Sequence, residues 1–142
     1  MNNKELARRW FDEVWNQKNL NVMGEMLHSD CSGFLEGGVV KGVDQFRQLA
    51  FAPLVAAFPD LVVTLENVIG EGDDVAVRWS VTATHTGPIL GIPASGRKVN
   101  FSGMTWLRFS EGKLIEGWDR WNLHGLLSLL ESGTPTATAS WV

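Results

Sequence analysis

The fold is decided by residues 99–123, which read VNFSGMTWLRFSEGKLIEGWDRWNL. Two runs rich in β-branched and aromatic residues, Val99–Phe109 and Leu114–Leu123, flank the turn sequence SEGK. Such runs, separated by a few residues that include glycine, predict an antiparallel hairpin. Because side chains alternate between the two faces of a strand, each run also indicates which residues share a face.

The odd-numbered residues of both strands are predicted to face inward, toward a core. A two-residue turn at Glu111–Gly112 would place Thr105 and Asp119 on opposite faces of the hairpin. A three-residue loop, Ser110–Gly112, with a left-handed glycine at its end, keeps the two on one face. We favour the three-residue loop, because it also keeps the apolar residues of both strands together.

Three polar side chains interrupt the apolar inward faces: His85, Thr105 and Asp119. A carboxylate among apolar residues is costly unless it is paired, hydrogen-bonded or neutral, and desolvation raises its pKa. Asp119 is therefore a candidate acid/base, although a structural aspartate that holds the backbone or an arginine has the same pattern. His85 ends its strand before a Gly-Pro loop, where a packing or capping role is the simpler interpretation.

The rest of the chain places helices first and strands afterwards. The predicted elements are helices at the start of the chain and over 20–27, 44–58 and 124–130, and strands over 31–40, 61–69, 75–86, 99–109 and 114–123. Pro53 is expected to kink or split its helix. This order predicts an α+β domain over residues 1–131, in which three N-terminal helices pack on a curved, mainly antiparallel sheet around a cone-shaped cavity, followed by a tail over 132–142.

Composition narrows the function further. The chain has 142 residues with seven Trp, seven Phe and no Tyr, so no phenol acts as an acid or an oxyanion donor. One Cys and three widely spaced His predict neither a disulfide nor a metal site. The net charge is −4 and the Lys and Arg residues are scattered, which argues against nucleic acid. With no apolar signal segment and no membrane-spanning run, we expect a cytoplasmic protein that does not bind membranes.

The even-numbered, outward face of the last two strands carries an unusual apolar area. Trp106 and Trp118 lie there among Arg108 and Arg120, and both residue types are enriched at protein interfaces. We expect a homodimer through this face. The alternative is that the tail of the same chain, with Trp141, covers the two indoles.

Six short motifs are spread over most of the chain and are specific as a group. They are FPD (58–60), GDDVAVRW (72–79), THTG (84–87), GIP (91–93), SGRKV (95–99) and EGKLIEGWD (111–119). Together they resemble the SnoaL-like polyketide cyclase family of the nuclear transport factor 2-like superfamily. The resemblance implies a cone-shaped α+β barrel, commonly dimeric and free of metal or cofactor, that closes a ring of a small hydrophobic or aromatic, polyketide-like ligand by aldol chemistry.

Carried over by position, the family's acid/base residue is Asp119. The family motif has a His fourteen positions earlier, where this chain has Thr105, which cannot shuttle a proton at neutral pH. A second family acid corresponds to Asn122. His85 matches a position that is frequently His in the broader group, and it is a candidate for the missing base.

The expected chemistry is cofactor-free proton transfer beside a carbonyl, in an aldol-type cyclisation or an isomerisation. Thr105 or His85 would bind the carbonyl oxygen, and Trp79, Trp121 and Phe34 would stack on a ring-bearing substrate. The first-helix aromatics are expected mainly in the core.

Two other functions fit the sequence. One is a non-catalytic, dimeric ligand-binding or accessory domain, which would be favoured by a salt-bridged Asp119 and a Thr105 shut off from the pocket. The other, ranked lower, is an epoxide-hydrolase-like enzyme, which needs two carboxylates bridged by an arginine. The strand arginines Arg78, Arg108 and Arg120 are all predicted to face outward.

Overall fold

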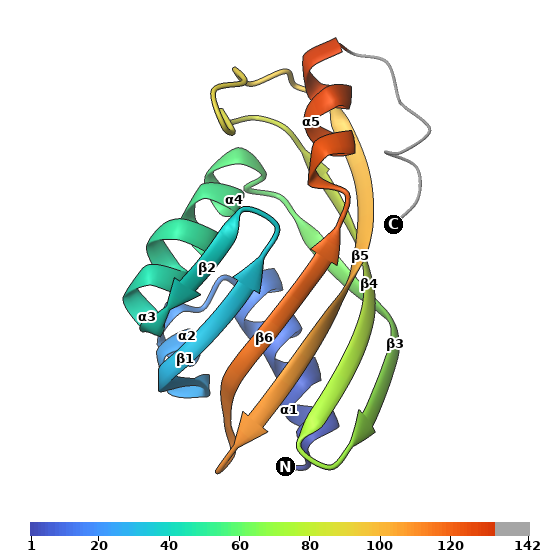
Figure 1. Ribbon diagram of the computed structural model, residues 1–142. Coiled ribbons are helices and arrows are strands. Elements are labelled where there is room, and N and C mark those ends of the chain that lie inside the picture. The colour runs from blue at the N-terminus through green and yellow to red at the C-terminus, as the bar shows by residue number, and fades with distance from the viewer. Residues whose placement is uncertain (133–142) are drawn as a thin grey trace.

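The computed structural model describes residues 1–132 as a six-stranded sheet with helices over its concave face (Figure 1). The strands are β1 (Leu27–Leu35), β2 (Gly38–Lys41), β3 (Val62–Glu71), β4 (Asp74–Thr84), β5 (Lys98–Ser110) and β6 (Lys113–Trp121). Their spatial order is β2-β1-β6-β5-β4-β3, antiparallel except for the parallel pair β1–β6. The sheet is therefore mixed and open, with β2 and β3 as its edges, and the predicted α+β class is confirmed.

Two of the helices change their winding along their length. The helical segments are α1 (Asn3–Arg9) continuing into η1 (Trp10–Asn16), α2 (Leu20–Met26), α3 (Gly42–Gln45) continuing into η2 (Phe46–Phe51) and α4 (Ala52–Ala57), and α5 (Leu123–Ser132). Both η segments are wound as π-helix, a wider form that often occurs at functional sites. Pro53 lies in the first turn of α4, directly after η2, so the helix widens before the proline instead of breaking.

The first helix begins at a reciprocal cap and buries one side. The Asn2 side chain accepts a hydrogen bond from the backbone N–H of Glu5, whose carboxylate accepts one from the backbone N–H of Asn2. Its apolar stripe recurs at the predicted helical spacing and is buried: Leu6, Ala7, Trp10, Phe11 and Val14. These residues lie against β3 and β4 and form one wall of the core.

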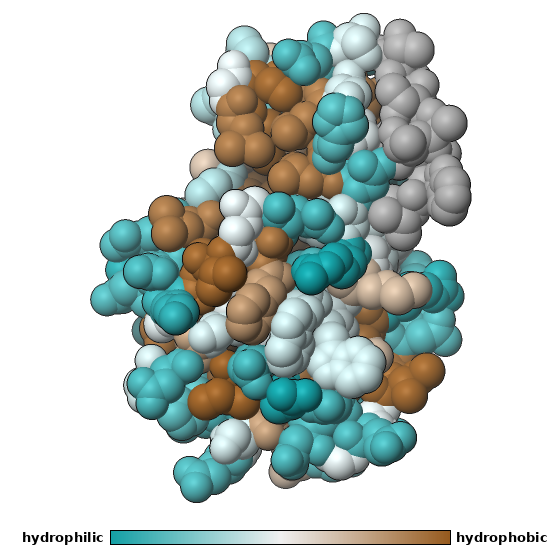
Figure 2. Space-filling model, viewed as in Figure 1, coloured by the Kyte–Doolittle hydropathy of each residue, from teal (hydrophilic) through white to brown (hydrophobic). Residues whose placement is uncertain are grey.

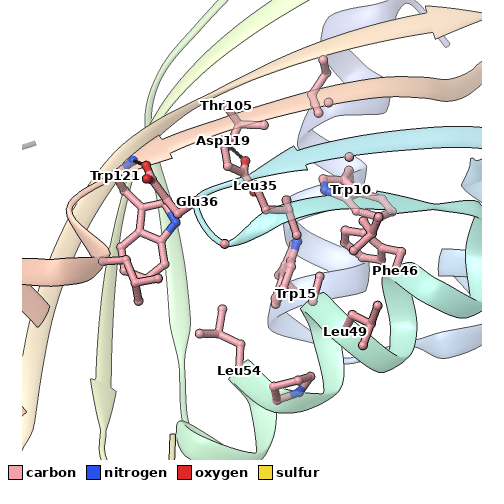
Figure 3. A pocket seen from close by; sticks show the side chains of 18 of the residues that line it. Trp10, Trp15, Leu35, Glu36, Phe46, Leu49, Leu54, Thr105, Asp119 and Trp121 are labelled. Atoms are coloured by element: carbon pink, nitrogen blue, oxygen red, sulfur yellow. Dashed lines mark hydrogen bonds between the residues drawn. The ribbon is translucent and has the colours of Figure 1, made fainter. Parts of the chain in front are cut away.

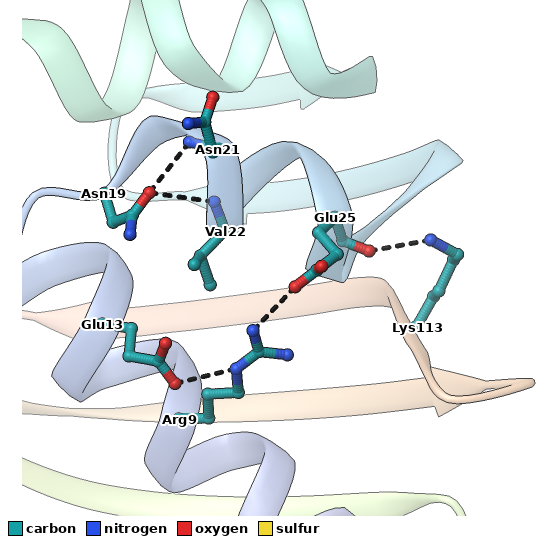
Figure 4. Close-up of polar contacts among 7 residues, drawn as sticks. All are labelled: Arg9, Glu13, Asn19, Asn21, Val22, Glu25 and Lys113. Atoms are coloured by element: carbon teal, nitrogen blue, oxygen red, sulfur yellow. Dashed lines mark hydrogen bonds and ion pairs between the residues drawn. The ribbon is translucent and has the colours of Figure 1, made fainter.

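Polar contacts join α1, α2 and the start of β6 (Figure 4). The Arg9 guanidinium bridges Glu13 at 2.8 Å and Glu25 at 2.7 Å, and Lys113 Nζ donates to the backbone carbonyl of Glu25 at 2.7 Å. The side chain of Asn19 caps α2. Exposed pairs of this kind contribute little individually, up to about 1 kcal/mol each, but together they define how α2 lies against the sheet.

The strand expected over 31–40 is in fact a hairpin. β1 starts earlier, at Leu27, and Leu35 pairs with Gly38, so that Glu36 and Gly37 form the turn. Gly38 has φ +143, a conformation that L side chains rarely adopt, which explains why the Gly-Gly pair ends the first strand. The hairpin turn places the Glu36 side chain beside the end of β6, where it contacts the backbone of Trp121.

The turn between β5 and β6 also differs from the predicted three-residue loop, although Thr105 and Asp119 still share a face. Phe109 pairs with Leu114 across a two-residue turn, Glu111–Gly112, whose residues both have positive φ. A β-bulge follows, because Arg108 pairs with Glu116 and leaves Ile115 as an extra residue. The bulge shifts β6 by one residue, so the odd-numbered residues of both strands share a face, as the three-residue loop was expected to achieve.

Within residues 1–132 no helix combines the length and the apolar character needed to span a bilayer. The predicted tail lies almost wholly outside the described residues, as does Trp141, the predicted alternative cover for the outer face.

Candidate active site

A pocket of about 500 Å³ lies between the concave face of the sheet and the helical wall made by η1 and η2 (Figure 3). It opens beside three exposed lining residues, Val39, Leu49 and Leu90. Figure 2 shows apolar residues gathered over α5 and the loop before β5, and Leu90 of this loop lines the pocket. Its lining is mostly apolar and aromatic, and the charged residues among the described lining are Glu36, Glu116 and Asp119.

Asp119 and Thr105 face each other across β6 and β5 in the sheet wall of the pocket. The two residues are direct cross-strand partners, and Thr105 Oγ1 donates a hydrogen bond to Asp119 Oδ1 at 2.6 Å. Trp79 Nε1 donates to Thr105 Oγ1 at 2.9 Å. An indole N–H is only a donor, so the threonine hydroxyl accepts from Trp79 and directs its own hydrogen to Asp119.

This chain of donors assigns different roles to the two carboxylate oxygens. Oδ1 of Asp119 is held as an acceptor, and within residues 1–132 Oδ2 has no hydrogen-bond partner. Asp119 lines the pocket and forms no salt bridge in the described part of the chain. Oδ2 is therefore the oxygen that is free to gain or lose a proton.

Burial raises the pKa of Asp119 to about 6. Desolvation is the largest cause, and the negative charge of Glu36 acts in the same direction. The Thr105 hydrogen bond and the nearby Arg120 charge act in the opposite direction, because both favour the ionised form. A carboxyl group with this pKa exchanges protons readily near neutral pH.

Glu36 lines the pocket but is not among the site residues predicted from the sequence. It projects from the β1–β2 turn, and its Oε1 accepts a hydrogen bond from the backbone N–H of Trp121 at 2.6 Å (Figure 3). The contact joins the hairpin to the end of β6, next to Asp119. In the sequence, Glu36 stands out as a single acidic residue before Gly37-Gly38 in an otherwise apolar stretch. This pattern indicates a pocket residue only if a hairpin is predicted at the two glycines.

The aromatic wall beside Asp119 contains both predicted indoles. Trp79 and Trp121 line the pocket in an edge-to-face arrangement, with ring centroids 6.4 Å apart, and Phe101 stacks on Trp121 at 5.1 Å. Gly103 allows this packing, since a Cβ there would lie 2.5 Å from the Cβ of Trp121 and 2.9 Å from the Trp79 ring.

Phe34, predicted as a substrate contact, does not line this pocket. Its ring stacks on Trp118 at 5.4 Å, and Arg108 lies over the Trp118 ring at 5.2 Å. Alternation along β1 directs Phe34 to the outer face of the sheet, where it covers part of the indole that was expected to be exposed.

His85 is likewise not brought to the pocket. Its side chain is fully buried against Phe58, and its Nδ1 accepts a hydrogen bond from the backbone N–H of Ser95 at 3.1 Å. Its Nε2 has no hydrogen-bond partner within residues 1–132. The backbone N–H of His85 donates to the Arg97 carbonyl, and the His85 carbonyl accepts from the Gly96 N–H, so that these bonds hold the loop before β5.

Asn122, at the position of the second family acid, caps a helix. Its side chain accepts a hydrogen bond from the backbone N–H of Gly125 at the start of α5, 2.9 Å away.

Residues 1–132 contain no group of three or more potential metal ligands.

Fold and pocket together define an α+β protein whose sheet and helices enclose an apolar, acid-bearing cavity. The model of the SnoaL-like polyketide cyclases matches residues 5–130, and this chain belongs to that family.

Solved structures agree with this assignment. A candidate SnoaL-like polyketide cyclase from Jannaschia sp. CCS1 is 31% identical with a TM-score of 0.85, over 94% of this chain and 93% of that one. AclR, a candidate hydroxylase from Streptomyces galilaeus, is 31% identical with a TM-score of 0.79, over 92% and 81% of the two chains. A Catenulispora acidiphila protein with a ketosteroid isomerase-like fold shares the fold at 21% identity and a TM-score of 0.74, over 97% of both chains. No protein of curated function matches the chain.

Proposed function

We propose that this protein is a cofactor-independent enzyme in which Asp119 moves a proton beside a carbonyl group of a small, ring-bearing substrate. The observation that carries the proposal is the Asp119 carboxyl itself. It faces an apolar pocket with one oxygen held by Thr105 and the other without a partner in the described chain. Membership of a cyclase family supports the reaction class, an aldol-type cyclisation or an isomerisation.

In the proposed step, ionised Asp119 removes a proton from the carbon next to the carbonyl. The electron pair of the broken C–H bond then forms a carbon–carbon bond to a second carbonyl of the same molecule, whose oxygen takes the proton from Asp119. In an isomerisation the same proton returns to a different carbon. Thr105 takes no proton in either case; it orients the carboxylate, and Trp79 and Trp121 lie where a flat substrate would stack.

The two other functions fit the pocket less well. A structural or purely binding role was expected to show a salt-bridged Asp119 and a secluded Thr105, whereas Asp119 has no such bridge in residues 1–132 and both residues line the pocket. An epoxide hydrolase needs an arginine between two carboxylates. Glu36 supplies a second carboxylate, but the described lining contains no arginine.

We further propose that the chain forms a homodimer through the outer face of the sheet. Trp118, Trp106, Ala76 and Ile69 are successive cross-strand partners on this face, and Trp106 and Ile69 are exposed. Arg108 beside them is paired with Asp74 and Glu116. An exposed apolar row across four strands is the kind of surface that a second subunit covers.

The catalytic proposal can be tested without knowledge of the natural substrate. We would measure exchange of the α-hydrogens of 2-tetralone in deuterated water by NMR, with wild-type protein, Asp119→Asn and Asp30→Asn. Asp30 is an exposed aspartate on β1 and matches the change in charge. We expect the Asp119 variant to lose about 100-fold or more of the protein-dependent rate and the Asp30 variant to keep it. An undiminished rate in the Asp119 variant would exclude the proposed role.

A further inference from the structure

The helical wall of the pocket carries hydrogen-bond donors that have no acceptor. Trp10 and Trp15 both line the cavity from η1, and Trp10 is only 3% exposed. Within residues 1–132 neither indole N–H has a hydrogen-bond partner. Figure 3 shows both ring nitrogens directed toward the interior between helix and sheet. Trp15 is half-buried, and neither indole nitrogen is among the fully buried unpaired atoms of the described chain, so both N–H groups reach the cavity and can donate to an oxygen that enters it.

The winding of η1 places both donors on one side of the helix. In an α-helix two residues five positions apart point about 140° away from each other, at 100° per residue. The π form joins residues five apart in one turn, as in the bond from the Gln17 N–H to the Asp12 carbonyl at 2.9 Å. Trp10 and Trp15 have this spacing, and π winding brings both to the pocket.

The two rings are held in place by packing from η2. Phe46 contacts both, with ring centroids 5.4 Å from Trp10 and 6.2 Å from Trp15, and Phe51 lies 5.1 Å from Trp15. Donors fixed in advance lose little freedom when they bind an acceptor.

The charge of the pocket indicates which acceptor fits. Glu36, Glu116 and Asp119 are in its lining, and the described lining contains no Lys, Arg or His. Glu116 is paired with Arg108, so an anionic ligand would be repelled mainly by Glu36 and Asp119, with no Lys or Arg in the described lining to offset that repulsion. An uncharged oxygen satisfies the two indoles without that repulsion.

We propose that Trp10 and Trp15 form a subsite for an uncharged carbonyl oxygen of the substrate, on the wall opposite Asp119. The inference rests on the proposed function in that the same pocket binds the substrate. It adds that the substrate is a neutral, ring-bearing ketone or quinone, and that its oxygen is bound by indole N–H groups. Neither a phenol nor His85 takes this role.

The subsite can be tested in ¹⁵N-labelled Asp119→Asn protein, so that proton transfer does not interfere. The indole N–H resonances of Trp10 and Trp15 would be assigned from Trp10→Phe and Trp15→Phe spectra. We expect 2-tetralone to shift these two proton resonances downfield, and tetralin, the hydrocarbon of the same ring frame, to leave them near their free positions. Equal shifts with both probes, or shifts confined to other tryptophans, would overturn the subsite.

Binding affinities give a second readout that does not depend on resonance assignment. The preference for 2-tetralone over tetralin should fall roughly two- to tenfold in Trp15→Phe, which keeps a ring but loses the N–H, and stay unchanged in Trp106→Phe on the outer face. Trp15 is less buried than Trp10, so its variant keeps the test open if Trp10→Phe does not fold. An unchanged preference in Trp15→Phe would contradict the proposal. If wild-type protein catalysed α-hydrogen exchange of 2-tetralone but bound 2-tetralone no more tightly than tetralin, only this subsite would be rejected. If it bound 2-tetralone more tightly but catalysed no exchange, only the role of Asp119 would be rejected.

Discussion

The hydroxyl of Thr105 donates to the carboxylate of Asp119 across two neighbouring strands, at 2.6 Å, where the family motif has a histidine in place of the threonine. A threonine cannot exchange a proton at neutral pH, but it can decide which carboxylate oxygen does. Because Trp79 donates to the same hydroxyl, the hydrogen of Thr105 points to Asp119. The pKa of this aspartate therefore depends on a balance between burial, Glu36 and the Thr105 bond.

Replacing Thr105 by valine should raise the pKa of Asp119 above about 6. Valine has nearly the same shape but donates no hydrogen bond, and the lost bond is one that favours the ionised carboxylate. The titration of Asp119 can be followed by ¹³C NMR of its carboxyl carbon. A midpoint that stays at the wild-type pH would show that Thr105 does not influence the carboxyl group.

Glu36→Gln should have the opposite effect and lower the pKa of Asp119. The glutamine oxygen still accepts the Trp121 backbone hydrogen bond, so the variant removes the negative charge while keeping the β1–β2 turn in place. The same ¹³C titration measures the result. If Thr105→Val and Glu36→Gln moved the midpoint in the same direction, the balance described here would be wrong.

The free energy of unfolding of Asp119→Asn, measured relative to wild type, should be larger at neutral pH than at low pH. Asp119 has a pKa of about 6 when folded and an ordinary value of 3.8, so the folded state binds the proton more tightly. The stability that this proton contributes is complete below the ordinary value and is lost as the pH rises through about 6. The variant does not lose it.

The expected gain of Asp119→Asn over wild type therefore grows by up to about 3 kcal/mol between pH 4 and pH 7.5. Urea unfolding at the two pH values measures it, with Asp30→Asn as the matched control. A difference between Asp119→Asn and wild type that is independent of pH would contradict the raised pKa.

Gly103→Ala should destabilise the fold by about 1–3 kcal/mol and disturb the aromatic wall of the pocket. The added Cβ would meet Trp121 and Trp79 closer than carbon atoms pack. Gly24→Ala is the matched control, since α2 leaves open space at that position and alanine is the better helix former, by up to about 1 kcal/mol. The two substitutions should thus shift the free energy of unfolding in opposite directions, and equal shifts would show that the space at Gly103 is not needed.

Trp106→Glu should convert the proposed dimer to monomers. The substitution puts a charge in the centre of the apolar row on the outer face, whereas Leu20→Glu changes an exposed leucine on α2, outside this row. Sedimentation velocity at micromolar concentration separates the two states. A wild-type protein that sediments as a monomer would remove the dimer proposal.

The sequence predicted the class of fold and the inward direction of Asp119 and Thr105, because strand alternation and turn composition are local signals. The route to their pairing was wrong, since a bulge at Ile115, and not the length of the turn, restores the register. A bulge depends on how two strands twist against each other, and a single strand's pattern does not reveal it.

Strand alternation also predicted that Trp79 and Trp121 would line the pocket, but other parts of the pocket lay beyond local patterns. Glu36 enters it because Gly37-Gly38 turns β1 into a hairpin, and Trp15 enters it because its helix is wound as a π-helix. His85 and Phe34 were predicted at the site from resemblance and residue type, and the structure places both elsewhere, one behind the loop before β5 and one on the outer face. Each of these four positions depends on contacts between segments far apart in the chain.

The central claim is that the carboxyl group of Asp119 is the one that moves the proton. The most direct test is the rate of α-hydrogen exchange of 2-tetralone as a function of pH, measured beside the ¹³C titration of Asp119 in the same protein. The rate should rise with the ionised fraction, with a midpoint near pH 6 that coincides with the ¹³C midpoint and moves with it in Thr105→Val and Glu36→Gln. A rate that is independent of pH across this range, or a midpoint that stays fixed while the Asp119 titration moves, would contradict the account.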